Sequence, residues 1–155
     1  MKRREMIGVL GMGAAALVTT EAMALAAQEA KDKDHDHHHD HHEHVRIIGE
    51  CALICNMTAH HCLEKLSEKD GDAKAHAKVQ GLAMDCQEFC VLTLTLMARH
   101  SELSKYAHEA CVEACRCCAE ACEASSEQSD QVKKCAKACR DCEKTCRDML
   151  KQMKH

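Results

Sequence analysis

The 155-residue chain lacks proline and tryptophan, and it has a single phenylalanine, Phe89, and a single tyrosine, Tyr106. A core built on aromatic side chains is therefore excluded. The formal net charge of −4 is small and acidic and basic residues are interspersed, so no basic face for nucleic acid is expected. We recognise no set of nucleophile, base and orienting group and no cofactor motif, which argues against an enzyme. What the chain has in excess is cysteine, at 14 positions.

Thirteen of the fourteen cysteines fall on one repeated ladder. Steps of four, three and four residues place the members of each set on one face of a helix. In heptad terms these are a and d positions, where a bundle normally keeps leucine or isoleucine. The four sets are Cys51, Cys55, Thr58 and Cys62; Cys86, Cys90, Thr93 and Met97; Cys111, Cys115, Cys118 and Cys122; and Cys135, Cys139, Cys142 and Cys146. The remaining cysteine, Cys117, falls on an outward position.

The pattern predicts four helices, at roughly 46–68, 73–99, 101–125 and 129–153. Three short connections between them predict an all-α fold, an antiparallel up-down-up-down four-helix bundle with a cysteine-lined core. Ser101 and Ser129 are the expected starts of the last two helices. Apolar residues and threonines alternate in the run Phe89–Met97, as they would in a strand, but the ladder positions within this run favour a helix. Because the second helix is apolar on all sides, we expect it to form the interface of a homo-oligomer.

The first residues have the features of an export signal. A basic head with paired Arg3 and Arg4 precedes a short apolar stretch, and Ala26 ends a plausible cleavage site. The arginine pair favours the twin-arginine route, with the general secretory route as the alternative. We therefore predict a periplasmic or cell-envelope protein with no membrane span in its mature form. The predicted regions are an export signal at 1–26, a disordered His/Asp-rich linker at 27–45 and the bundle at 46–155.

Three interpretations compete for the cysteine ladder. Buried cysteine can act as a small hydrophobe, but thirteen oxidisable thiols make a poor core by packing alone. A disulfide framework fits an exported protein, yet such frameworks usually join loops rather than helix faces. Thiolates are also soft ligands for Cu(I), Zn(II) or iron–sulfur clusters. We favour a store of multiple Cu(I) ions, because Cu(I) accepts two or three ligands and bridging thiolates, and a Cys-x3-Cys pair can chelate one ion.

The main alternative is sequestration of zinc or mixed metals, as in metallothioneins. Zinc sites typically use Cys-x2–4-Cys pairs held in turns, and iron–sulfur motifs commonly lie in loops. The present cysteines lie within long helices and lack a glycine-containing knuckle. Burying thirteen unpaired thiolates would be very costly, so the metal-free thiols are expected to be neutral and metal to replace their protons.

With four ladders on four consecutive helices after an export signal, the chain resembles the bacterial copper storage proteins. The resemblance covers about residues 46–153. It implies a four-helix bundle that holds many Cu(I) ions, with the thirteen ladder cysteines as ligands. It also implies a homo-oligomer, export in some members, and copper held for recipient copper enzymes or for protection.

The two ends of the predicted bundle differ in their donors. Continuing the ladder beyond the cysteines places thioethers and imidazoles together at one end of an antiparallel bundle, which we call the mouth. Such a cluster of donors is expected at an entry port for copper. The predicted mouth residues are Met97, His100, His108, Met149 and Met153. The opposite end has no soft ligand among its expected residues, which are Lys65, Val79, Ala83 and Val132. We expect His60, His61 and His76 to point outward into solvent, and Met57 and Met84 to lie off the ladder.

Residues 35–44 hold seven histidines among carboxylates. No apolar period runs through them, so we expect no packed structure there. Free imidazoles and carboxylates bind Cu(II), Zn(II) or Ni(II) well. Two roles stay open for this His-rich arm: a solubilising linker, or a collector that delivers metal to the mouth.

Overall fold

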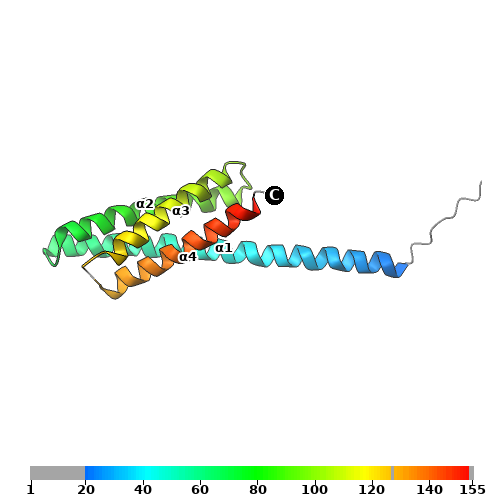
Figure 1. The fold of residues 1–155 in the computed structure, drawn as a ribbon, viewed down its shortest axis with the longest axis horizontal. Coiled ribbons are helices and arrows are strands. Elements are labelled where there is room, and N and C mark those ends of the chain that lie inside the picture. Colours follow the sequence, from blue (N-terminus) through cyan, green and yellow to red (C-terminus); the bar gives the residue numbers. More distant parts are fainter. Residues whose placement is uncertain (1–19, 127, 154–155) are drawn as a thin grey trace, which may run out of the picture. The chain divides into compact units, whose positions relative to one another are not determined.

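The structure, a computed structural model, describes residues 20–126 and 128–153, with side chains from residue 42 onward (Figure 1). Its helices are α1 (Thr20–Glu68), α2 (Ala73–Ala98), α3 (Ser104–Glu123) and α4 (Asp130–Gln152). A compact unit begins at His39 and contains the bundle. The predicted export signal lies mostly outside the described residues, so it stays a prediction.

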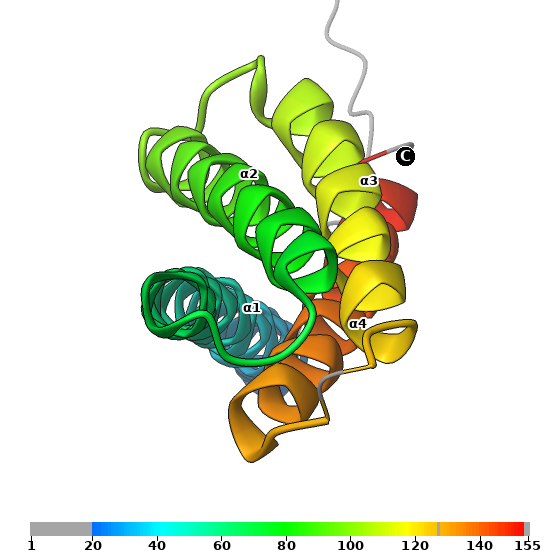
Figure 2. The same cartoon turned by 90° about the vertical axis from the view of Figure 1, so that its left-hand side faces the viewer.

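The four helices run alternately up and down, and Figure 2 shows them in an end view. Helix α3 packs against both α2 and α4. Helix α1 closes the ring, because its Cys55 approaches Cys135 of α4 at 3.9 Å. Cys51 of α1 also groups with Cys86 and Cys90 of α2. The predicted antiparallel four-helix bundle is confirmed, and the strand-like run in α2 is helical.

Helix starts follow the local sequence in two cases and depart from it in one. Asp72 caps α2 by accepting hydrogen bonds from the backbone N–H groups of Lys74 and Ala75. Ser129 caps α4, as predicted. The prediction that Ser101 starts α3 was wrong. Its hydroxyl accepts from the backbone of Leu103 at 3.3 Å, which forms a turn before the helix.

Two helices end on a residue in the left-handed region that is not glycine. Lys69 follows α1 with φ 56°, and His100 follows α2 with φ 49°. In the second case, the backbone N–H of Ser101 bonds Leu96 O at 3.0 Å. This is the Schellman pattern, which satisfies the last helical carbonyls and turns the chain sharply. These turns make the short connections that the bundle requires.

Helix α1 is longer than expected. We predicted a start near residue 46, but the helix begins at Thr20 and includes the His-rich arm. No proline occurs in the chain and no glycine lies between Gly13 and Gly49, so nothing in this stretch interrupts a helix. Alanine, glutamate and lysine before the arm favour helix further. The lack of an apolar period in the arm therefore placed the predicted start of α1 too late in the chain.

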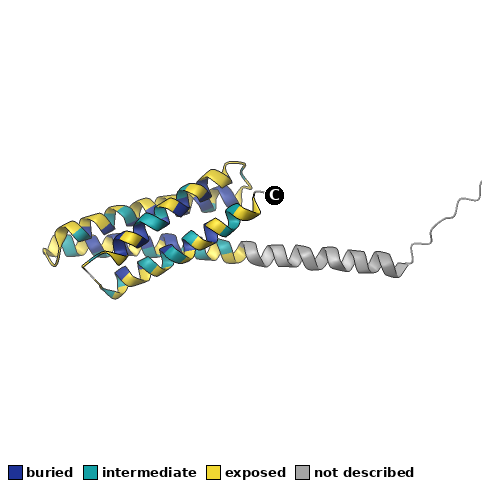
Figure 3. Cartoon of the chain, in the orientation of Figure 1, coloured by how far each residue is buried: buried dark blue, intermediate teal, exposed yellow. Residues whose placement is uncertain are grey.

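The residues at the ladder positions of all four helices are buried, and Figure 3 shows buried residues along the inner side of each helix. The two ladder threonines, Thr58 and Thr93, are fully buried and donate their hydroxyl hydrogens to backbone carbonyls four residues earlier, at 2.8 Å each. Met57 and Met84 are about half exposed, which confirms that they lie off the ladder. The core of the bundle is thus formed by the predicted face of each helix.

Helix α2 keeps apolar side chains outside as well as inside. Within the described part of the chain, α2 is long and apolar enough to cross a membrane, judged by length and composition alone. The core helix of a soluble protein can have the same length and composition. Cys86 and Cys90 on its inner face are completely buried in the bundle. On its outer side Phe89 and Leu92 are 37% and 46% exposed. The absence of a membrane span in the mature form stays a prediction.

Candidate metal centre

The thirteen ladder cysteines form one buried column of sulfur. Each has at most 1% of its surface exposed, whereas Cys117 is only partly buried. All fourteen cysteines lie in the described part of the chain, and none forms a disulfide. The sulfurs of Cys55 and Cys139 lie 3.5 Å apart, as do those of Cys86 and Cys115. A disulfide bond is about 2.05 Å long, so these are free thiols in van der Waals contact.

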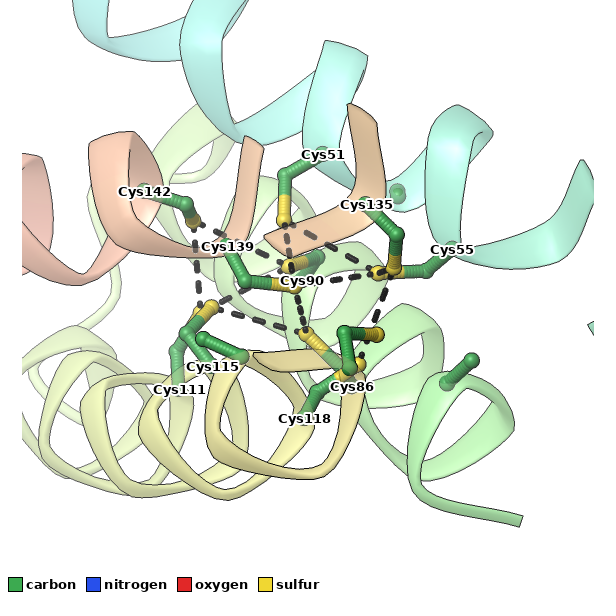
Figure 4. Packing of buried hydrophobic residues seen from close by; sticks show 14 of the residues in the cluster. Cys51, Cys55, Cys86, Cys90, Cys111, Cys115, Cys118, Cys135, Cys139 and Cys142 are labelled. Atoms are coloured by element: carbon green, nitrogen blue, oxygen red, sulfur yellow. Dashed lines mark hydrogen bonds between the residues drawn. The ribbon is translucent and has the colours of Figure 1, made fainter. Parts of the chain in front are cut away.

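Ten of these cysteines form four overlapping groups (Figure 4). Within each group, the four sulfur atoms lie within 4.8 Å of one another. The groups are Cys51, Cys86, Cys90 and Cys115; Cys51, Cys55, Cys86 and Cys139; Cys55, Cys118, Cys135 and Cys139; and Cys90, Cys111, Cys115 and Cys142. Six cysteines belong to two groups each, so neighbouring groups share sulfur atoms.

All four helices contribute to the shared groups. Cys51 of α1 lies 3.9 Å from Cys139 of α4. Cys90 of α2 lies 3.7 Å from Cys111 of α3. A metal ion bound between such pairs would link two helices, and shared sulfurs would join successive ions in a chain. The remaining ladder cysteines, Cys62, Cys122 and Cys146, extend the column beyond the four groups.

Eight ladder cysteines have raised pKa values, which favour the neutral thiol, whereas hydrogen bonds with neighbouring thiols lower the pKa values of Cys51, Cys86, Cys111 and Cys135. The pKa of Cys122 is raised by its hydrogen bonds with Cys118 and Cys135 and by burial. The pKa of Cys115 is raised by hydrogen bonds with neighbouring thiols, among them Cys111 and Cys142, and by burial. Deprotonating the whole column without metal would bury many negative charges close together. A soft cation that replaces the protons removes this obstacle.

A pocket of about 430 Å³ lies beyond one end of the column. Four of the five predicted mouth residues line it, namely Met97, His100, Met149 and Met153. Met97 is 4% exposed and forms the inner part, whereas Met153 is 38% exposed at the rim. The structure thus brings these side chains together as the register predicted. Whether they bind metal stays a prediction.

The fifth mouth residue, His108, lies deeper. Its side chain has no exposed surface, and its Nδ1 lies 2.7 Å from the backbone carbonyl of Ser104. That contact favours a proton on Nδ1 and leaves a lone pair on Nε2. Nε2 is buried and has no hydrogen-bond partner among the described residues. His108 precedes Cys111 by three residues on the same face, so its free nitrogen is arranged as a ligand would be.

The opposite end differs from the prediction in one residue. Val79, Ala83 and Val132 are buried there, as expected. His76, however, is only 1% exposed, so its assignment to an outward position was wrong. It precedes Val79 by three residues and therefore continues the ladder of α2, a signal present in the sequence. His60 is exposed as predicted, whereas His61 is partly buried with Nε2 3.2 Å from Ser129 Oγ.

Comparison with known proteins identifies this arrangement. A family model described as copper storage protein matches residues 37–151. The chain belongs to the copper storage protein family. The predicted function of copper storage is confirmed at the level of this family, and the buried cysteine groups could hold metal. The family is one of storage proteins, and the absence of catalysis stays a prediction. A search of the curated proteins finds no match.

Solved structures share the fold of this family member. The Cu(I)-bound copper storage protein BsCsp3 is 24% identical, with a TM-score of 0.63 over 72% of this chain and 98% of that one. A copper storage protein from Streptomyces lividans, loaded with 10 copper equivalents, is 24% identical, with a TM-score of 0.64 over 72% and 84%. A protein from Nitrosospira multiformis is 30% identical, with a TM-score of 0.61 over 74% and 97%.

Proposed function

We propose that the thirteen buried thiols are the ligands of a multi-ion Cu(I) store, with His108 and the mouth methionines as terminal donors. The observation that carries the proposal is the overlap of four sulfur groups across all four helices. Cu(I) accepts bridging thiolates, so one sulfur can serve two neighbouring ions. The protein performs no catalytic step in this role; it takes up, holds and releases copper. The solved relatives described as Cu(I)-bound and copper-loaded support this cargo.

Charge balance predicts the capacity. Thirteen thiolates carry thirteen negative charges in a buried column, and unbalanced buried charge is costly. Each Cu(I) cancels one charge, so neutrality is reached at about thirteen ions, and sharing of sulfurs allows roughly ten or more. A load of this size uses every ladder cysteine without leaving buried thiolates unpaired.

Zinc is the second candidate, because each group of four sulfurs has a suitable size. Four sulfurs around one Zn(II), with Zn–S bonds of about 2.3 Å, lie about 3.8 Å apart. The hydrogen-bonded sulfur pairs here are 3.5 to 4.0 Å apart, and all four sulfurs of each group lie within 4.8 Å of one another. Yet structural zinc sites are typically closed sets of four ligands, and only two of the four groups can be filled without sharing a sulfur. Zinc would therefore leave much of the column unused.

Anaerobic titration of the reduced mature protein with Cu(I) and, separately, with Zn(II) tests this assignment. Saturation near ten to thirteen Cu(I) ions per chain is expected, with only about two or three for Zn(II). Elemental analysis after desalting gives the retained ions. Saturation at one or two Cu(I) ions would contradict storage in the whole column.

We also propose export to the periplasm or cell envelope, and a homo-oligomer formed through the outer face of α2. The oligomer is supported by the apolar side chains left outside on this helix, such as Phe89 and Leu92. Sedimentation of the wild type and of a Phe89→Glu, Leu92→Glu variant tests it, with dissociation expected in the variant. A copper enzyme is the proposed recipient of released metal.

A further inference from the structure

A second opening reaches the sulfur column from the side. A groove of about 800 Å³ runs between α1 and α4, lined by His44, Ile47 and Cys51 from α1 and by Ala138, Thr145 and Asp148 from α4, among others. One core cysteine, Cys51, is thus among the residues that line the groove, although its side chain is fully buried. In the end pocket, by contrast, no thiol is found among the described residues that line it. The groove therefore leads toward a buried core cysteine.

Cys51 is well placed to receive an ion and to pass it on. It has no exposed surface, yet it lines the groove. It belongs to two of the four sulfur groups, and its sulfur lies 4.0 Å from Cys55 and 3.9 Å from Cys139 (Figure 4). An ion bound at Cys51 is therefore one exchange away from sulfurs on either side of the column.

His44 supplies the donor atom at the outer part of this groove. It precedes Cys51 by seven residues, with Ile48 between them on the ladder, so it continues the inner face of α1. Its Nδ1 is buried and has no hydrogen-bond partner among the described residues. The side chain as a whole is partly exposed, so the ring can be reached from solvent.

The carboxylates of the groove form ion pairs, including Asp141 with Lys137 at 2.6 Å. Arg46 pairs with Glu43 at 2.6 Å and with Glu50 at 2.9 Å. Asp148 pairs with Lys151 at 2.7 Å. These ion pairs leave the imidazole nitrogen of His44 as the soft donor available in the groove.

We propose that the α1–α4 groove is a side entrance to the store, in which His44 receives Cu(I) and transfers it to Cys51. The proposal rests on the proposed function, and it assigns to the last histidine of the His-rich arm a role in loading. Seven residues of α1, about two helical turns, separate the two donors, so the ion first leaves His44 Nδ1, then moves along the groove and binds Cys51 Sγ. The thiol proton leaves to solvent, and copper stays Cu(I) throughout, so no redox partner is needed.

The test measures loading rate and final capacity together. Anaerobic stopped-flow mixing of reduced mature protein with Cu(I) on a weak chelator reports uptake through the ultraviolet absorption of Cu(I)–thiolate bonds. His44→Leu removes the donor and keeps approximate volume, and Ala138→Leu narrows the groove beside Cys51. We expect each variant to load several-fold more slowly than the wild type, while final capacity is unchanged.

His60→Leu is the matched control, since His60 lies on the same helix with a side chain that is 71% exposed and outside the groove. It should load at the wild-type rate. Wild-type rates in both groove variants, with normal capacity, would overturn the side entrance and leave the storage function intact. A wild type that retains only one or two Cu(I) ions would overturn the storage function itself. Helical circular dichroism of each variant confirms that the bundle is formed.

Discussion

At the scale of single residues, the ends of the sulfur column are distinguished by histidine nitrogens without partners. A buried polar atom usually has a hydrogen bond, because an unpaired one costs about 1–3 kcal/mol. Within the described residues, His44 Nδ1, His76 Nε2 and His108 Nε2 have none. For His108, which precedes Cys111 on the ladder, and for His44, which lies one ladder position before Ile48, a metal ion is the partner that would remove this cost. No role follows from the structure for His76.

Replacing His108 tests its role as a terminal ligand. His108→Leu should keep the bundle folded, since leucine suits a buried a/d position. We expect the variant to retain nearly the full Cu(I) load but to bind the last one or two ions more weakly. Competition with a high-affinity Cu(I) chelator measures this as earlier release of those ions. Release that matches the wild type throughout would show that Nε2 is not a ligand.

The mouth thioethers can be removed without altering the core. Changing Met97, Met149 and Met153 to leucine together conserves approximate volume and deletes three soft donors. Slower transfer of Cu(I) between protein and chelator is expected, with capacity nearly unchanged because the thirteen thiols remain. The control is Met57→Leu and Met84→Leu, two methionines about half exposed and off the ladder. Equal transfer rates in both sets would exclude the mouth as a route.

At the scale of elements, each helix combines a ladder with local signals for its ends. Asp72 and Ser129 are caps that short-range sequence rules find. The C-terminal turns are less obvious, since Lys69 and His100 adopt a left-handed conformation usually taken by glycine. These positions cost stability, because a side chain in this region crowds the backbone. At these two positions, backbone strain is accepted so that the connection to the next helix can be short.

Lys69→Gly should therefore stabilise the bundle. Glycine adopts φ 56° without steric cost, so we expect a gain of about 1 kcal/mol in the free energy of unfolding. Glu68→Gly, one residue earlier and still inside α1, should instead lose about 1 kcal/mol. Chemical denaturation of the two reduced, metal-free variants measures both changes. A loss of stability in Lys69→Gly would mean that the lysine side chain makes contacts that outweigh the strain.

At the scale of the whole molecule, the sequence predicted the fold because the ladder repeats on four helices and fixes their register. It placed the core and four mouth side chains correctly for the same reason. It missed the burial of His76 and the ladder position of His44, because neither residue is a cysteine and the pattern was not continued past Val79 and Ile48. It also misplaced the start of α1, where helix propensity acts without apolar periodicity. Ion pairs and the side groove depend on distances that spacing alone does not give.

The pH dependence of stability should have opposite signs in the empty and loaded protein. In the empty protein, pKa values such as those of Cys115, Cys122 and Cys139 are raised by contacts with neighbouring thiols and by burial. The folded state then holds protons that the unfolded thiols release above about pH 8.5, so stability falls as pH rises past that value. The slope is about 1.4 kcal/mol per pH unit for each thiol that stays protonated.

In the loaded protein, copper has displaced these protons and links all four helices. Its stability should therefore be constant at high pH and fall only in acid, where protons compete for the thiolates. Melting temperatures of empty and loaded protein between pH 4 and 10 measure both trends, and loading should raise the value at every pH where copper stays bound. Parallel pH profiles in the two states would mean that copper binds outside the column. The same would follow if loading left the melting temperature unchanged, because ions bound between buried sulfurs of different helices must be released before the helices separate.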